Sequence, residues 1–149
     1  MSTQPYLFGD TWIPIKDGDP SAMAIFKRHY TARQRRKIEQ FIGPGEKEAY
    51  ISPDALALFA WRKFISDAGE TGINCCVFRN EGTALGKSSD LIRAACELAW
   101  ARWPRERLYT YVDPSKVKHK RDPGRCFIKA GFRKCGATKE GKLIFERFP

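Results

Sequence analysis

The sequence lacks several features that would assign it quickly to a class. Its five cysteines are an odd number and contain no CxxC pair, which argues against a disulfide framework and against a zinc ribbon. The two histidines, His29 and His119, are 90 positions apart in the sequence and form no His-based metal motif, so we predict no metal site. No apolar run approaches the length of a bilayer span, and no secretory leader opens the chain. We therefore expect a cytoplasmic protein with reduced thiols and no membrane partner.

What is present suits one globular domain. The chain has 149 residues, of which 42% are hydrophobic and 13% aromatic, enough for a substantial core. Residues 1–45 are rich in proline and basic residues and predict an irregular lead-in with one short strand near residues 12–15. For residues 21–41 the sequence is compatible with two alternatives, a helix and an ordered basic loop. Residues 46–149 predict the core, so the expected organisation is a single domain over 1–149.

The balance of charge is strongly basic. There are 27 Lys and Arg against 17 Asp and Glu, a formal net charge of +10. Such a surplus attracts polyanions, and it is concentrated in two clusters with Tyr30 and Phe127 nearby, a combination that fits phosphate contact with aromatic stacking. The alternative is a solvated basic surface. The residues we predict to bind nucleic acid are Arg33, Arg35, Arg36 and Lys37 in the first cluster, and Lys118, Lys120 and Arg121 in the second.

Hydrophobic patterning and turn residues predict the order of elements. Residues 48–51, 55–64 and 72–80 favour an antiparallel meander. Residues 88–103 form the strongest helical pattern, with Ser88 or Ser89 as its cap and Pro104 after its end. A strand over 108–112, a short helix over 124–130 and two strands over 132–135 and 143–148 complete the chain. This order predicts an α/β fold with a mixed central sheet flanked by helices.

A glycine-bearing segment, Gly82 to Ser88, lies between the predicted strand over 72–80 and the long helix. The Walker spacing is missing, because three residues instead of four separate Gly82 from Gly86, so we set the P-loop interpretation aside. Backbone amides in such a turn and at a helix start still favour an anion such as a pyrophosphate. An ordinary loop is the alternative.

The segment from Gly72 to Phe148 resembles the core of the GCN5-related N-acyltransferase (GNAT) family. In that family a central strand leads into a turn that holds the pyrophosphate of coenzyme A, and a long helix follows. Residues 127–132 (Phe-Ile-Lys-Ala-Gly-Phe) also match a later family signature. The resemblance implies an acyl-coenzyme A donor, most simply acetyl-coenzyme A, held by Arg79, Gly82, Ser88, Ser89 and Arg93. Phe127 stands where the family often has a proton-donating Tyr, so another group must protonate the departing thiolate.

A narrower similarity is to the Mom-like branch of bacteriophage proteins, which modifies adenine in DNA. The residues that carry it are His29 and Tyr30 before the core, Phe78 and Arg79 at the end of a strand, Ser89 and Arg93 in the helix, and Tyr111 to Asp113 at the end of the next strand. This similarity implies nucleic acid, with DNA favoured, as the partner. It also adds His29 to the candidate catalytic residues.

Asp113 is a candidate on its own chemistry. It follows a predicted strand next to the central one, where open α/β sheets place ligands, and a carboxylate there can accept a proton from an amine. Tyr111, two residues earlier, shares its face of the strand. The alternative is that Asp113 only forms the turn at Asp113-Pro114. The sequence thus predicts an N-acyltransferase acting on an amine of nucleic acid, with two alternatives: acetylation of a small-molecule or protein amine, and non-catalytic nucleic-acid binding.

Overall fold

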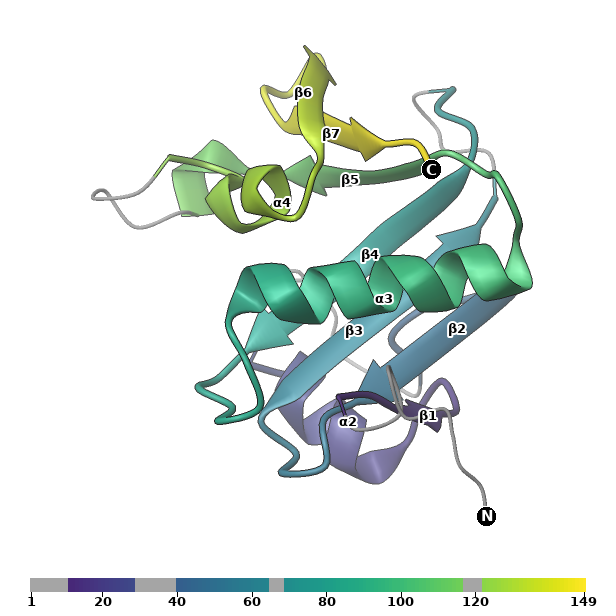
Figure 1. Cartoon of the computed structure of the whole chain (residues 1–149), viewed down its shortest axis with the longest axis vertical. Coiled ribbons are helices and arrows are strands. Elements are labelled where there is room, and N and C mark those ends of the chain that lie inside the picture. The colour runs from purple at the N-terminus through teal and green to yellow at the C-terminus, as the bar shows by residue number, and fades with distance from the viewer. Residues whose placement is uncertain (1–10, 29–39, 65–68, 117–121) are drawn as a thin grey trace.

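The computed structural model describes residues 11–28, 40–64, 69–116 and 122–149. Within these ranges the elements, in chain order, are β1 (Ile13–Ile15), α2 (Pro20–Phe26), β2 (Glu46–Ile51), β3 (Ala57–Lys63), β4 (Ile73–Asn80), α3 (Ser88–Arg102), β5 (Leu108–Val112), the 3-10 turn Pro114–Lys116, α4 (Arg125–Lys129), β6 (Arg133–Ala137) and β7 (Leu143–Arg147) (Figure 1). The expected order of strands and helices is confirmed. The segment that the sequence left open begins as a helix, α2, whose N-cap Asp19 accepts a hydrogen bond from the Ala22 amide at 3.1 Å.

The described strands form one mixed sheet of seven strands in the order β1-β2-β3-β4-β5-β7-β6. The pairs β1–β2, β2–β3 and β3–β4 are antiparallel, as the predicted meander requires. β4 and β5 are parallel, with α3 as the crossover between them. β7 lies between β5 and β6 and is antiparallel to both. The chain therefore forms the edge strand β6 first and then returns to insert β7 beside β5. The mixed α/β class is therefore confirmed.

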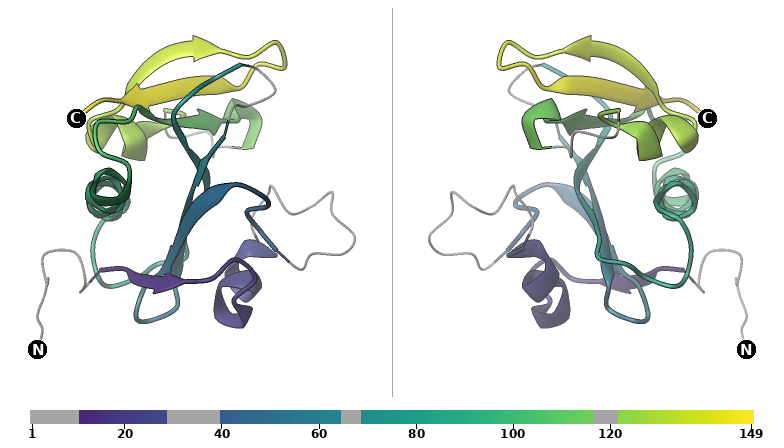
Figure 2. Two further views of the ribbon diagram at one scale, coloured as in Figure 1. Left: turned by 90° about the vertical axis from the view of Figure 1, so that its right-hand side faces the viewer. Right: turned by 90° about the vertical axis from the view of Figure 1, so that its left-hand side faces the viewer.

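Two apolar cores lie on opposite faces of this sheet, because α3 covers one face and α2 the other (Figure 2). On the α3 side, two buried tryptophans also hold the helix by hydrogen bonds. Trp12 Nε1 donates to the Leu91 carbonyl and Trp61 Nε1 to the Ala95 carbonyl, both at 2.9 Å. Since these carbonyls are one helical turn apart, the two rings fix the position of α3 along the sheet.

The α3 sequence explains its placement. Leu91, Ile92, Ala95, Cys96 and Ala99 recur at helical spacing and are all fully buried, while the opposite side carries charged residues. Burying one Leu or Ile side chain stabilises the fold by roughly 1.5–3 kcal/mol, so this face dominates the docking of the helix. The helix ends at Arg102, before Pro104.

One glycine is required where β4 begins beside β5. Gly72 has φ +117°, and a Cβ atom there would meet the Arg107 carbonyl oxygen at 2.5 Å. Only a residue without a side chain fits both constraints. The parallel pair can thus start in close contact.

Candidate functional site

The parallel strands β4 and β5 pair over only part of their length. Ile73 pairs with Leu108, Asn74 with Tyr109 and Cys75 with Thr110, although β4 continues to Asn80 and β5 to Val112. At the last pair, Thr110 Oγ1 donates to the Cys75 carbonyl at 3.2 Å. Beyond it the two strands part.

A bulge in β4 lies at the point of divergence. Along the edge shared with β3, Trp61 pairs with Cys75 and Ala60 with Val77, so Cys76 is an extra residue in β4. A bulge of this kind bends a strand and increases its local twist. It gives a physical reason for β4 to turn away from β5 directly after Cys75.

A cavity of about 770 Å³ lies where the strands part. Its volume falls within the range of small-molecule sites. It is lined by residues 74–78 of β4, 87–89 at the start of α3, 110–113 at the end of β5, and residues 122, 124–127 and 129 around α4, together with Lys116 and Lys142. Phe78 and Phe127 form an apolar wall, with ring centroids 6.2 Å apart.

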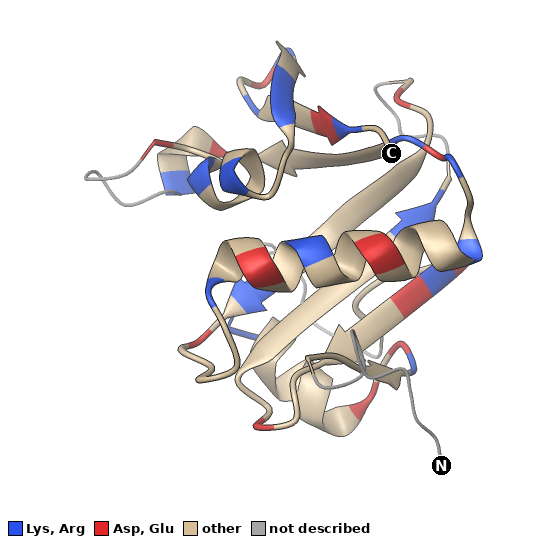
Figure 3. Ribbon diagram, in the orientation of Figure 1, with Lys and Arg blue, Asp and Glu red and all other residues tan. Residues whose placement is uncertain are grey.

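The rim of the cavity is basic. Five lining residues are cationic against two acidic ones, Asp113 and Asp122. Figure 3 shows cationic residues along α4 and β6, above the start of α3. A cleft with this balance attracts anions and favours phosphate-bearing ligands. The five cationic residues are Lys87, Lys116, Arg125, Lys129 and Lys142.

In the glycine-bearing turn, in contrast, backbone amides already donate hydrogen bonds to side chains of the protein. Asn80 Oδ1 accepts hydrogen bonds from the amides of Gly82 at 2.9 Å and Thr83 at 3.0 Å. Asp54 Oδ2 accepts from Thr83 Oγ1 at 2.7 Å and, at 3.4 Å, from the Ala84 amide. The amides of Gly82, Thr83 and Ala84 therefore already have side-chain acceptors within the protein, as expected for the ordinary loop that was the alternative interpretation.

The start of α3 is open instead. Its N-cap position is Lys87 and no side chain caps the helix, so the predicted cap by Ser88 or Ser89 is wrong. Ser88 Oγ instead accepts a hydrogen bond from Asn80 Nδ2 at 3.1 Å. The first turn of a helix carries amides without helical partners and the positive end of the helix dipole. Because Ser88 and Ser89 line the cavity, that end of α3 lies at its mouth.

Arg79 and Arg93, two of the predicted donor-binding residues, have other partners and do not line the cavity. Arg79 Nε donates to Glu81 Oε2 at 2.7 Å, and Arg28 binds the same carboxylate through two nitrogens at 2.7 and 2.6 Å. These hydrogen bonds lower the pKa of Glu81 to about 2, and the bond from Arg28 has the largest effect.

Arg93 joins α3 to α4, because it pairs with Asp90 at 3.2 Å and donates to the Lys129 carbonyl. Gly82 does not line the cavity either. Of the five predicted donor residues, the structure thus brings Ser88 and Ser89 to the cavity and leaves Arg79, Gly82 and Arg93 outside it.

Both candidate residues at the end of β5, Tyr111 and Asp113, line the cavity. Asp113 Oδ1 accepts from the Ser115 amide at 3.0 Å and from Ser115 Oγ at 2.6 Å, so the carboxylate also forms the turn that was its alternative role. The Ser115 hydroxyl is the main cause of a lowered pKa at Asp113, which keeps this carboxylate ionised and makes it a weak base. Tyr111 is half-buried, with its ring 5.7 Å from that of Tyr109.

The remaining predicted residues lie outside the described ranges. They are His29, the third candidate catalytic residue, and the nucleic-acid-binding candidates Arg33, Arg35, Arg36, Lys37, Lys118, Lys120 and Arg121.

Most of the lining residues were not predicted as site residues, among them Asn74, Thr110 and Lys142. Asn74 did carry a signal, since a buried strand rarely includes an asparagine without a reason. Lys142 carried none, because it lies in the turn before β7, far along the chain from the rest of the cavity.

The sequence matches no model of a known protein family, and no curated protein matches it significantly. In the described part of the chain, no helix combines the length and the apolar character needed to cross a membrane. Across the same residues, no three His, Cys, Asp or Glu side chains gather in an arrangement that could hold a metal ion.

Proposed function

We propose that this protein is a GNAT-type N-acyltransferase that takes an acyl-coenzyme A donor, most simply acetyl-coenzyme A, and modifies an amine on nucleic acid. The observation that carries the proposal is the cavity of about 770 Å³ between the parting strands β4 and β5, with the uncapped start of α3 and five cationic residues around it. Ligands of α/β sheets bind at the carboxyl ends of such strands.

The residues present fit a donor that carries phosphates. The amides at the start of α3, the hydroxyls of Ser88 and Ser89, and Lys87 would hold its pyrophosphate. Phe78 and Phe127 would face its less polar part. When bound, the donor supplies an acyl group activated as a thioester. Because Arg79 and Arg93 are already paired, the binding role assigned to them passes in this proposal to Lys87 and Lys142.

Two side chains of the cavity suit the proton transfers of an acyl transfer to nitrogen. Asp113, ionised, would accept the proton that the attacking amine releases. Tyr111 would donate a proton to the departing thiolate, a step that Phe127 cannot perform. His29 remains a third candidate on the strength of the Mom-like resemblance alone.

The choice of nucleic acid as acceptor rests on charge. The net charge of +10 and the cationic residues on the rim favour a polyanion over a neutral small molecule. DNA is favoured because of the resemblance stated above. Mass analysis of nucleosides from DNA and RNA exposed to the protein and acetyl-coenzyme A tests the acceptor: an acylated nucleoside is expected, whereas acylation of only a small amine or a protein would select the first alternative.

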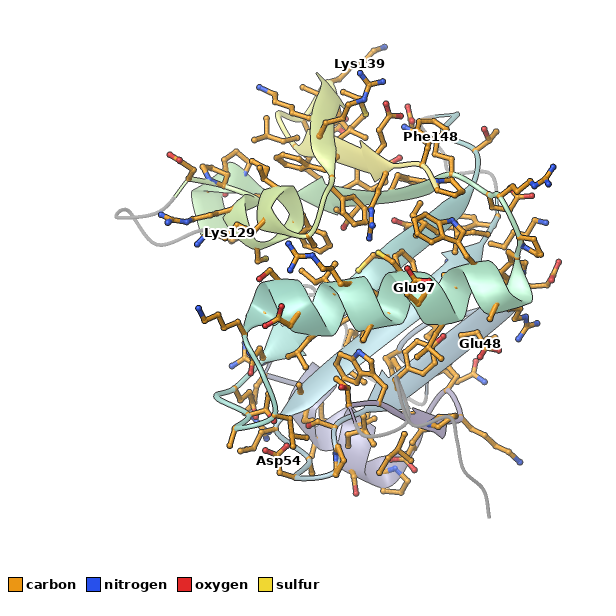
Figure 4. The ribbon with its side chains drawn as sticks, in the orientation of Figure 1. Glu48, Asp54, Glu97, Lys129, Lys139 and Phe148 are labelled. Atoms are coloured by element: carbon orange, nitrogen blue, oxygen red, sulfur yellow. The ribbon has the colours of Figure 1, made fainter. Side chains whose placement is uncertain are left out.

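The donor is tested by thermal unfolding in the presence of acetyl-coenzyme A. Binding should stabilise the protein by about 2.7 kcal/mol at a hundredfold excess over the dissociation constant. Lys142→Ala should weaken donor binding about fivefold, because one rim charge is lost. Lys139→Ala is the matched control, since this exposed lysine of the same hairpin does not line the cavity and lies at the hairpin tip, away from Lys129 (Figure 4).

Two outcomes would contradict the donor assignment. If acetyl-coenzyme A gives no stabilisation while nucleic acid still binds, the protein is a non-catalytic nucleic-acid-binding protein. If Lys139→Ala and Lys142→Ala weaken the donor equally, the donor binds outside the cavity.

A further inference from the structure

Asn74 lies at the innermost end of the split, next to the last pair that joins β4 to β5. It lines the cavity and is 7% exposed. Its Oδ1 atom is fully buried and has no hydrogen-bond partner within the protein.

This makes Asn74 an exception among the buried polar residues of the described chain. Ser52 and Thr83 are bonded to Asp54, Thr110 to the Cys75 carbonyl, and Glu146 to two arginines. The Tyr50 hydroxyl and Arg147 Nη1 also lack a hydrogen-bond partner, but neither residue lines the cavity. Buried polar groups in proteins are nearly always paired, so an unpaired one in the lining of a cavity calls for a partner from outside the chain, such as a group of a ligand.

The chemistry of the side chain defines that partner. A primary amide offers a donor and an acceptor side by side, so its complement is a planar edge that carries an N–H donor next to an acceptor. The aromatic side chains of Phe78 and Tyr111 also line the cavity, and such rings stack on flat heterocycles. An amino-bearing nucleobase presents such an edge and such a face.

From this arrangement we infer that Asn74 is a specificity-determining residue, which binds the amine-bearing edge of a nucleobase taken out of its stack into the cavity. The inference rests on the proposed function, because the exocyclic amine is the group that the reaction would modify. It adds the recognition step: the cavity accepts single extruded bases, and Asn74 selects those with an N–H donor on the edge.

The test compares two mononucleotides of equal charge, deoxyadenosine monophosphate and its N6,N6-dimethyl derivative, titrated into the full chain and followed by NMR. The unmodified nucleotide should bind more tightly, because dimethylation removes the N–H donors. Asn74→Leu should weaken its binding about tenfold or more and abolish the discrimination. Asn74→Ala serves as a second, smaller substitution. Thr110→Val is the matched control, since Thr110 lines the same cavity but is already paired with Cys75.

The outcomes separate the inference from the proposed function. Equal binding of the two nucleotides by the wild-type chain, or unchanged discrimination in both Asn74 variants, overturns the inference even if acetyl-coenzyme A stabilises the protein. Discrimination that depends on Asn74 supports it even if acetyl-coenzyme A does not bind. Because Asn74→Leu removes an unpaired buried amide, the variant should also melt at or above the wild-type temperature, which excludes misfolding as the cause of lost binding.

Discussion

The two halves of the β4–β5 pair behave differently. In the half that begins at Gly72, residues such as Ile73 and Leu108 are fully buried and the strands are in register. In the half beyond Cys75 and Thr110, the strands part, and Phe78 and Tyr111 remain only partly buried beside the cavity. The comparison indicates that the paired half supplies stability, whereas the parted half gives up strand pairing and gains space for a ligand.

The strongest test of this contrast is Gly72→Ala in the paired half. The added Cβ would meet the Arg107 carbonyl oxygen at 2.5 Å, and φ +117° is unfavourable for any side chain. We expect a loss of roughly 2–4 kcal/mol in the free energy of unfolding, measured by urea denaturation. Gly69→Ala is the control, because Gly69 also has positive φ, +85°, but nothing lies within 4 Å of its Cβ position. It should cost about 1 kcal/mol. Equal losses would show that β4 and β5 are not held closely at this point.

In the parted half, Asp113→Asn should affect turnover and not stability. Asn can accept the same hydrogen bonds from Ser115, so the free energy of unfolding should change by less than about 0.5 kcal/mol. Turnover should fall about a hundredfold, the lower end for a positioned proton acceptor, since its lowered pKa makes Asp113 a weak base. Asp122→Asn, at another carboxylate of the cavity, should retain full turnover. Full turnover in Asp113→Asn would show that Asp113 only forms the turn and is not the proton acceptor.

The smallest effect is expected just after the end of β4, at the carboxylate shared by Arg28 and Arg79. Glu81→Gln should cost roughly 1 kcal/mol at neutral pH, because Arg28 is half-exposed and solvent weakens the pair. The pKa of Glu81 is lowered to about 2, so this stabilisation is present above pH 4.5 and is lost as the pH falls toward 2. Unfolding curves of wild type and variant should therefore converge in acid. Glu97→Gln on the exposed side of α3 is the control and should show no such convergence (Figure 4).

The elements were predictable from the sequence because their signals are local. The alternation in the strands, the helical spacing of Leu91, Ile92 and Ala95, and the stop at Pro104 each act within a few residues. The order of elements and the α/β class follow from these signals. The placement of Asp113 at the end of a strand beside the central one was predictable for the same reason.

The details of the candidate site were not predictable, because they depend on contacts between distant segments. Asp54, 29 positions before Thr83, occupies the glycine-bearing turn that looked open to an anion. Asn80 engages the Ser88 hydroxyl that looked like a helix cap. Local patterns show which groups can bind a ligand, but only the tertiary structure shows which are already bonded.

The hydrogen bond from Trp12 to Leu91 also bears on how the chain matures during its synthesis. The two residues are separated by 79 positions, so the partner of an early tryptophan is one of the later residues to be made. At bacterial to eukaryotic rates of translation, on the order of 5–20 residues per second, Trp12 waits roughly 4–16 s for the helix that covers it. The strands β2, β3 and β4 are synthesised within that interval, so the indole N–H of Trp12 finds its acceptor only after the three strands that α3 covers are complete.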